Sequence, residues 1–98
     1  MKIESTVSPE ESVLRLSGCL DTSAAAEFGA ALEKVAAAKS LIIDFSEVDF
    51  IASSGIRLLV SANKKAVAEG RLVTLTGMNE VISDVFDVTG LNEVFTIR

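Results

Sequence analysis

Residues 41–76 contain two strand-type segments separated by a helix-type segment, and this succession constrains the fold more than any other feature of the chain. Residues 41–45 form a short apolar run between polar neighbours, which predicts a central strand buried on both faces of a sheet. Residues 72–76 form a second β-type run, and Gly70 suits the position directly after a helix. A strand, a helix and a strand of these lengths predict two parallel strands joined by a right-handed crossover.

The helix between these strands has one apolar face and one mostly polar face. Spacings of three and four residues predict the buried face, which consists of Ile56, Leu59, Val60, Asn63 and Val67. The opposite face consists of Arg57, Ser61, Lys64, Lys65 and Ala68. We expect this face to be solvated, or to contribute Arg57, Ser61 and Lys64 to a partner surface.

The first twenty residues predict a hairpin. Residues 2–7 and 12–17 have the composition of strands, and the Ser-Pro-Glu-Glu sequence of residues 8–11 is typical of a turn. Gly18 is expected to end the second strand. Cys19 is then expected to be a small buried residue at a strand end.

Two further helices complete the pattern. The first follows Asp21, Thr22 and Ser23, each of which can cap it, and its apolar face consists of Ala24, Phe28, Ala31, Leu32 and Val35. The alanines at 36–38 are helix-forming sequence. The last amphipathic segment contains Val81, Ile82, Val85, Phe86 and Val88. It is interrupted at residues 89–90 and followed by a strand at 94–97, so the predicted order is β-β-α-β-α-β-α-β.

Composition limits the class of protein. The 98 residues, 49% hydrophobic and 23% charged, predict one folded domain over residues 1–98. A net charge of −5 without a basic run argues against nucleic acid as a partner. No apolar run approaches the ~20 residues of a membrane span and the start lacks signal-peptide architecture, so we expect a soluble, cytoplasmic, monomeric protein. One cysteine and no histidine argue against disulfides, metal sites and cofactors.

Ser53, Ser54 and Gly55 stand at the predicted start of the second helix, and this triplet supports two interpretations. In the structural one, a serine caps the helix by accepting a backbone N–H bond, and Gly55 permits close packing. In the functional one, a hydroxyl at a helix N-terminus accepts a phosphate, because free N–H groups and the positive dipole end stabilise its charge of roughly −1.5 to −2. That charge would turn off the binding of a partner covering this turn.

An enzymatic role is disfavoured, and we expect no catalytic residue. A serine nucleophile needs a base, and the chain contains no histidine. Lys64 and Lys65 lie two to three helical turns from the serines, too far to deprotonate them at a rise of ~1.5 Å per residue. Since no glycine-rich phosphate loop is present either, the chain is interpreted as a binding protein.

Several segments resemble the signature of the STAS domain family, of the anti-sigma factor antagonist type. Residues 42–46 (IIDFS) followed by residues 48–56 (VDFIASSGI) resemble its central motif. Residues 16–21 (LSGCLD) resemble a strand end of the family, and residues 81–95 resemble its C-terminal helix and final strand. The resemblance extends over essentially the whole chain and implies a single STAS-like α/β domain with a mixed sheet.

The resemblance also implies a function. In this family a bacterial anti-sigma factor, itself an ATP-dependent serine kinase, phosphorylates the first serine of the motif, and the unphosphorylated antagonist binds the anti-sigma factor and frees the sigma factor. By position, Ser53 is the implied phosphoacceptor and Ser54 the second choice. Asp21 is implied to lie beside the serine, and Arg57, one turn further on, is placed to pair with a phosphate. The implied partner-binding residues are Asp21, Thr22, Ser53, Ser54, Gly55, Arg57, Ser61 and Lys64.

One position departs from the family pattern and keeps an alternative open. Most members carry an aspartate directly before the two serines, whereas this chain has Ala52. A missing carboxylate favours a domain that is a constitutive subunit of a larger assembly, such as a stressosome or a lipid-transport complex, in which Ser53 is not phosphorylated.

Overall fold

The structure, a computed structural model, describes residues 1–35 and 38–98, and its elements follow the predicted order. The strands are β1 (Lys2–Thr6), β2 (Glu11–Leu20), β3 (Ser40–Ile51), β4 (Leu72–Thr76) and β5 (Thr96–Ile97). The helices are α1 (Ala25–Lys34), α2 (Ser53–Ala68) and α3 (Glu80–Thr89), with short 3-10 helices η1 (Thr22–Ala24) and η2 (Leu91–Glu93). The alanines at 36 and 37, predicted to be helix-forming, lie outside the described residues.

The five strands form one mixed sheet in the order β1-β2-β3-β4-β5. The predicted hairpin is confirmed, because β1 and β2 pair antiparallel, and the predicted crossover is confirmed by the parallel pairing of β3 with β4. β2 pairs parallel with β3, and the short β5 pairs parallel with β4. β3 is therefore the central strand, as expected.

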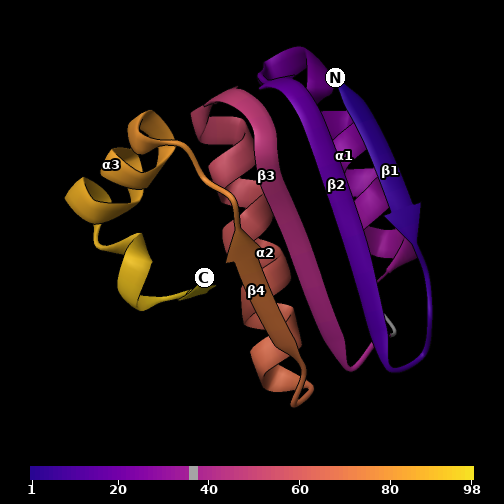
Figure 1. Cartoon of the computed structure of the whole chain (residues 1–98). Helices are drawn as coiled ribbons and strands as arrows, with labels where there is room; N and C mark the ends of the chain where they lie inside the picture. Colours follow the sequence, from indigo (N-terminus) through magenta and orange to yellow (C-terminus); the bar gives the residue numbers. More distant parts are fainter. Residues whose placement is uncertain (36–37) are drawn as a thin grey trace.

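Helices α1 and α2 cover one face of the sheet, and α3 stands at the side of the molecule beyond β4 (Figure 1). The core lies under the two helices, where Phe28 of α1 and Leu59 of α2 meet Ile43 and Phe45 of β3. The prediction that residues 41–45 are buried on both faces was wrong. Because no helix covers the other face of β3, burial alternates along this strand as in a one-sided sheet.

β2 and β3 continue further than predicted. Gly18 does not end β2; its φ of +100°, which glycine adopts without strain, accompanies register shifts between β2 and β3. Pairing then resumes and continues to Leu20 and Ile51. This two-strand extension carries both chain segments beyond the end of β4, to the edge of the sheet where α2 begins.

Some helical faces also differ from the prediction. In α2 the buried positions are Gly55, Leu59, Asn63 and Ala66, whereas Val67 is 67% exposed. Val67 follows Ala66, and one residue turns the helix by about 100°, away from the sheet. The polar face is exposed as predicted, and Gly70 follows the helix with a φ of +72°.

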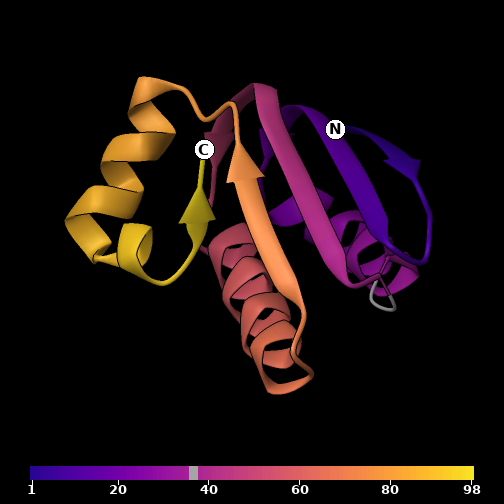
Figure 2. The same ribbon diagram turned by 60° about the horizontal axis from the view of Figure 1, so that its bottom comes forward.

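The C-terminal segment is mostly turn rather than strand. Strand pairing begins only at Thr96, because residues 91–95 form η2 and a turn in which the Val94 and Phe95 amides both donate to the Leu91 carbonyl. Phe95 is buried with its ring centroid 5.8 Å from that of Phe86 in α3. Figure 2 shows the resulting β5 beside β4, with α3 outside both.

Candidate functional site at the start of α2

The ends of β2 and β3 bring the predicted site residues together. Leu20 and Ile51 are register partners, and the Ala52 amide donates a 2.8 Å hydrogen bond to the Leu20 carbonyl. Because the strands are parallel, the segments that begin at Asp21 and at Ala52 leave the sheet at the same edge, the upper one in Figure 1. Functional residues often gather at such carboxyl ends of parallel strands.

Gly55 seats the first turn of α2 on these strand ends. A Cβ atom at this position would lie 2.8 Å from Leu20 Cγ, which is too close for a real carbon contact, and at a tight 3.3 Å from Ile51 Cγ1. The prediction that Gly55 permits close packing is therefore confirmed. The glycine fixes how near the serines lie to the end of β2.

Neither serine caps α2, so that part of the structural interpretation was wrong. Ala52, extended at φ −88° and ψ 165°, occupies the cap position, and no side chain of the described residues caps this helix. Ser53 and Ser54 are the first and second residues of the helix itself, so they come one and two positions after the cap. The first helical bond runs from the Ile56 amide to the Ala52 carbonyl, so the amides of residues 53–55 point out of the helix start.

The two serines differ in exposure and in contacts. Ser53 is exposed, whereas Ser54 is half-buried. The Ser54 hydroxyl donates a long hydrogen bond of 3.4 Å to the hydroxyl of Thr22, the first residue of η1. This contact joins the segment after β2 to the start of α2, and it leaves the Ser53 hydroxyl as the accessible one.

Asp21 is the first residue after β2. Its Oδ1 accepts 2.7 Å from the Ser23 hydroxyl and 3.0 Å from the Ala24 amide, so it caps η1, which leads into α1, and not α1 itself as predicted. The bond from Ser23, followed by the bond from the Ala24 amide, holds the pKa of the Asp21 carboxyl below its usual value. Asp21 is therefore a fixed negative charge at the end of β2.

Arg57, Ser61 and Lys64 lie on the exposed side of α2 that begins at Ser53. Arg57 is one turn from Ser53, within reach of a group on its hydroxyl. At a rise of ~1.5 Å per residue, Ser61 and Lys64 lie ~12 Å and ~16 Å further along the axis than Ser53. The structure thus brings Arg57 to the serine, while Ser61 and Lys64 belong only to a more extended surface.

Sequence reasoning missed an exposed apolar pair next to this site. Cys19 was expected to be buried, but it is exposed, and its register partner is Phe50. Phe50 is 50% exposed, whereas the other four phenylalanines are at most 5% exposed. The bulged pairing of β2 and β3 turns both side chains to the face opposite the helices. Regular alternation would place Phe50 on the buried face with Val48, so its exposure follows from the irregular strand pairing, for which the sequence carries no local signal.

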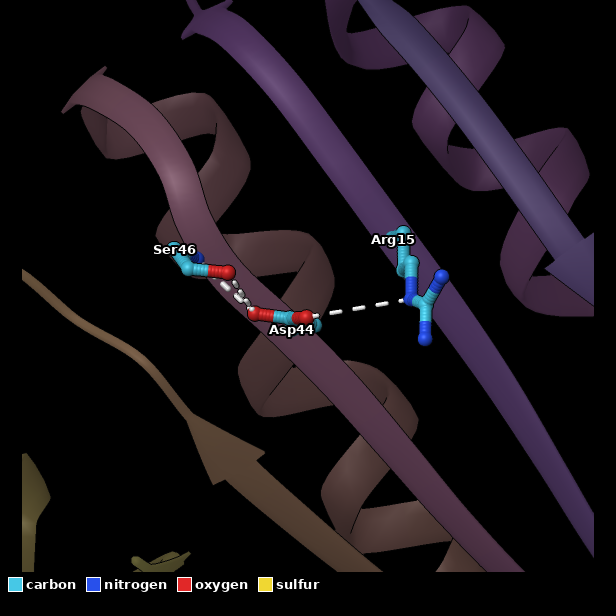
Figure 3. A network of polar contacts seen from close by, with 3 residues as sticks. All are labelled: Arg15, Asp44 and Ser46. Carbon is cyan, nitrogen blue, oxygen red and sulfur yellow. Dashed lines mark hydrogen bonds and ion pairs between the residues drawn. The ribbon is translucent and has the colours of Figure 1, made fainter.

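A second polar cluster lies on the uncovered face of the sheet. Figure 3 shows Arg15, Asp44 and Ser46 together, with the Ser46 amide and hydroxyl both donating to Asp44 Oδ1 and Arg15 Nε 3.9 Å from Oδ2. The Ser46 hydroxyl bond, then its amide bond, lower the pKa of the Asp44 carboxyl. Gly77 packs so closely here that a Cβ would lie 2.9 Å from Asp44 Oδ1. The cluster secures the β4–α3 connection rather than the α2 site.

Two other kinds of site, metal centres and membrane-spanning helices, are absent from the described residues. Their cysteine, aspartate and glutamate side chains form no group of three or more that could hold a metal ion. None of the helices in the described part of the chain is long and apolar enough to cross a bilayer.

Comparison with known proteins identifies the family. A family model described as "Mlab, STAS domain" matches residues 4–97. Among solved structures, an anti-sigma factor antagonist from Mycobacterium paratuberculosis is similar with a TM-score of 0.86 and 24% identity, over 98% of this chain and 83% of that one. The Bacillus cell fate determinant SpoIIAA in its phosphorylated form is similar with a TM-score of 0.78 and 24% identity, over 99% of this chain and 91% of that one. The chain, with its five-stranded mixed sheet and three helices, belongs to the STAS domain family.

Proposed function

We propose that this STAS domain is an anti-sigma factor antagonist. In its unphosphorylated form it binds an anti-sigma factor that is also an ATP-dependent serine kinase, and this binding releases a sigma factor. Phosphorylation of Ser53 turns the binding off. The observation that carries the proposal is the start of α2, where an exposed serine hydroxyl stands at a helix N-terminus that no described side chain caps.

The contacts of the two serines favour Ser53 as the phosphoacceptor. A kinase needs the acceptor hydroxyl to approach the terminal phosphate of ATP, so an exposed hydroxyl is the better substrate. Ser53 meets this condition, whereas Ser54 is half-buried and directed to Thr22. That a protein of this fold is phosphorylated is stated for the Bacillus neighbour, and the same modification is proposed here.

The surroundings of Ser53 can hold a phosphate. The amides of residues 53–55 and the positive end of the α2 dipole favour a negative charge at this point. The Arg57 guanidinium, exposed one turn further on, supplies a charge-assisted hydrogen bond. Asp21 at the end of β2 adds a second negative charge to the same edge. A partner seated over this turn would have to desolvate both charges, so phosphorylation would weaken binding without refolding the domain.

Binding to the kinases of the host tests the proposal. Each ATP-binding anti-sigma kinase of the host is purified and titrated with the unmodified domain and with Ser53→Asp, in the presence of ADP. We expect one kinase to bind the unmodified domain, and Ser53→Asp to weaken that binding by about tenfold or more, because a buried unpaired charge costs over 1.4 kcal/mol. Ser5→Asp, which adds the same charge at an exposed position of the edge strand β1, is the matched control and should change affinity much less. Equal affinity of the Ser53→Asp and unmodified domains for the kinase would contradict the proposal that phosphorylation of Ser53 turns binding off.

A second candidate function rests on Ala52. If the domain is a constitutive subunit of a larger assembly, the start of α2 is a permanent contact and Ser53 is not modified. Ala52, which supplies no carboxylate at the helix cap, favours this reading. The two candidates separate in the same titration, because a constitutive subunit would bind none of the host's anti-sigma kinases and would co-purify with its assembly at fixed stoichiometry.

A further inference from the structure

Helix α3 leaves an apolar surface without a covering element. Val81 is 62% exposed and Val88 is 88% exposed, while Val85 is half-buried. At about 100° per residue these three side chains lie within about 60° of one another, and we call them the valine face. Both views show α3 at the outside of the molecule, with no described element beyond it (Figures 1 and 2). Exposed apolar surface of this kind is typical of an interaction site.

The valine face is bordered by one sign of charge. Glu80, Asp84 and Asp87 are exposed and also lie within about 60° of one another on α3, and we call them the acidic flank. Helix α3 contains no lysine or arginine. In the described part of the chain none of the three carboxylates takes part in an ion pair. A surface that covers α3 should therefore combine basic side chains with an apolar contact.

The same chain carries such a surface on α2. Arg57, Lys64 and Lys65 are exposed there, the helix contains no acidic residue, and we call these three residues the cationic stripe. Val67, 67% exposed, borders the stripe with an apolar side chain. Within the described residues the cationic stripe also forms no ion pair. Both helices thus present unpaired charge, of opposite sign, next to exposed valine.

We propose that α3 of one copy of this chain docks against α2 of a second copy, with the valine face and acidic flank meeting Val67 and the cationic stripe. Two copies can make this contact twice around a two-fold axis, which closes a dimer, or once, which leaves one α2 and one α3 free for further copies. One helix pair buries less than the about 800 Å² per partner of a standard interface, so the association is weak and grows with protein concentration. The self-association does not presuppose the proposed binding to an anti-sigma factor, but both contacts use Arg57 and Lys64 of α2, so the two partners would compete.

Sedimentation equilibrium of the purified chain tests the contact. We expect the weight-average mass to rise with concentration above that of the monomer at low salt, and to fall when salt screens the charges. Asp84→Lys/Asp87→Lys should weaken self-association by about tenfold or more, and so should Lys64→Glu/Lys65→Glu. Glu10→Lys/Glu11→Lys, which changes the net charge by the same amount and sign as the α3 substitutions, is the matched control for that variant and should retain association. Thermal unfolding of each variant checks that it is folded.

Mixing the α3 variant (Asp84→Lys/Asp87→Lys) with the α2 variant (Lys64→Glu/Lys65→Glu) tests most directly whether these two helices contact each other. Each variant repels itself, but in the mixture every α3 finds an α2 of opposite charge, so association should return to nearly the original strength. A chain that stays monomeric at all concentrations would overturn the proposal. So would association that the α3 reversal leaves unchanged, or that mixing does not restore.

Discussion

The starts of α2 and α3 can be compared directly, because both helices follow a parallel strand and begin at the same edge of the sheet. Asn79 caps α3: its Oδ1 accepts 2.9 Å from the Ile82 amide, and its Nδ2 donates 3.1 Å to the Val48 carbonyl of β3. Ala52 stands at the corresponding position of α2 and offers no side-chain group. The start of α3 is thus closed by hydrogen bonds within the chain, whereas that of α2 is open.

This difference indicates that the start of α3 stabilises the fold and that the start of α2 is available for binding. A cap that also bonds to a neighbouring strand stabilises the fold, and Asn79 directs its Nδ2 group to the Val48 and Asp49 carbonyls and its Oδ1 to the Ile82 amide. The start of α2 is held instead by the contact of Gly55 with Leu20, which leaves its amides and the Ser53 hydroxyl free. Stability and binding are therefore assigned to different groups at the same edge of the sheet.

The largest effect on stability is expected at the packed side of the α2 start. Gly55→Ala should lower the free energy of unfolding by about 2 kcal/mol, because the new Cβ would overlap the buried Leu20 side chain. Gly29→Ala is the matched control in α1: its Cβ would lie at an ordinary 3.7 Å from Leu58 Cδ2, so the higher helix propensity of alanine should stabilise the fold by about 0.5–1 kcal/mol. Urea unfolding measures both. If the two substitutions had the same effect, the packing role of Gly55 would be wrong.

The next effect separates the two helix starts. Asn79→Ala should cost about 1.5 kcal/mol, because it removes a helix cap and a bond to β3. Ser53→Ala should change the free energy of unfolding by less than about 0.5 kcal/mol, because this exposed hydroxyl is not a cap. Thermal or urea unfolding of the two variants side by side makes the comparison. A Ser53→Ala variant as unstable as Asn79→Ala would show that the α2 start is structural.

A smaller effect, dependent on pH, is expected away from both helix starts. Asp44 has a lowered pKa in the folded chain, so the unfolded chain takes up the proton first as pH falls. The stability that this carboxylate contributes is therefore complete above the ordinary pKa near 4 and is lost as pH falls through the folded value. Asp44→Asn should cost about 0.5–1 kcal/mol at neutral pH, with the difference from the parent chain disappearing in acid. A difference that stayed constant down to low pH would contradict the assigned cause.

The sequence predicted local features well and missed those set by distant pairing. The element order, the packing role of Gly55 and the exposed position of Arg57 follow from periodicity and glycine placement within a few residues. The positive φ of Gly18 inside a strand, by contrast, depends on the partner strand β3, which is distant in sequence. The exposure of Cys19 and Phe50 has the same origin.

The cap of α2 was missed for a different reason. Serine is a preferred cap residue, and the sequence offers two serines in succession. The helix cap is Ala52, one residue before the first serine. The hydrogen bond from the Ala52 amide to the Leu20 carbonyl and the close packing of Gly55 against Leu20 fix it there. Tertiary contacts therefore overrode the local preference, and they did so at the residues proposed to be functional.

The central claim is that the open start of α2 presents Ser53 for phosphorylation. The most direct test is the intact mass of the purified chain after incubation with ATP and the host kinase that binds it. We predict the addition of one phosphate, retained in Ser54→Ala and absent in Ser53→Ala. A phosphate that persists in Ser53→Ala, or a chain that no such kinase modifies, would contradict the claim.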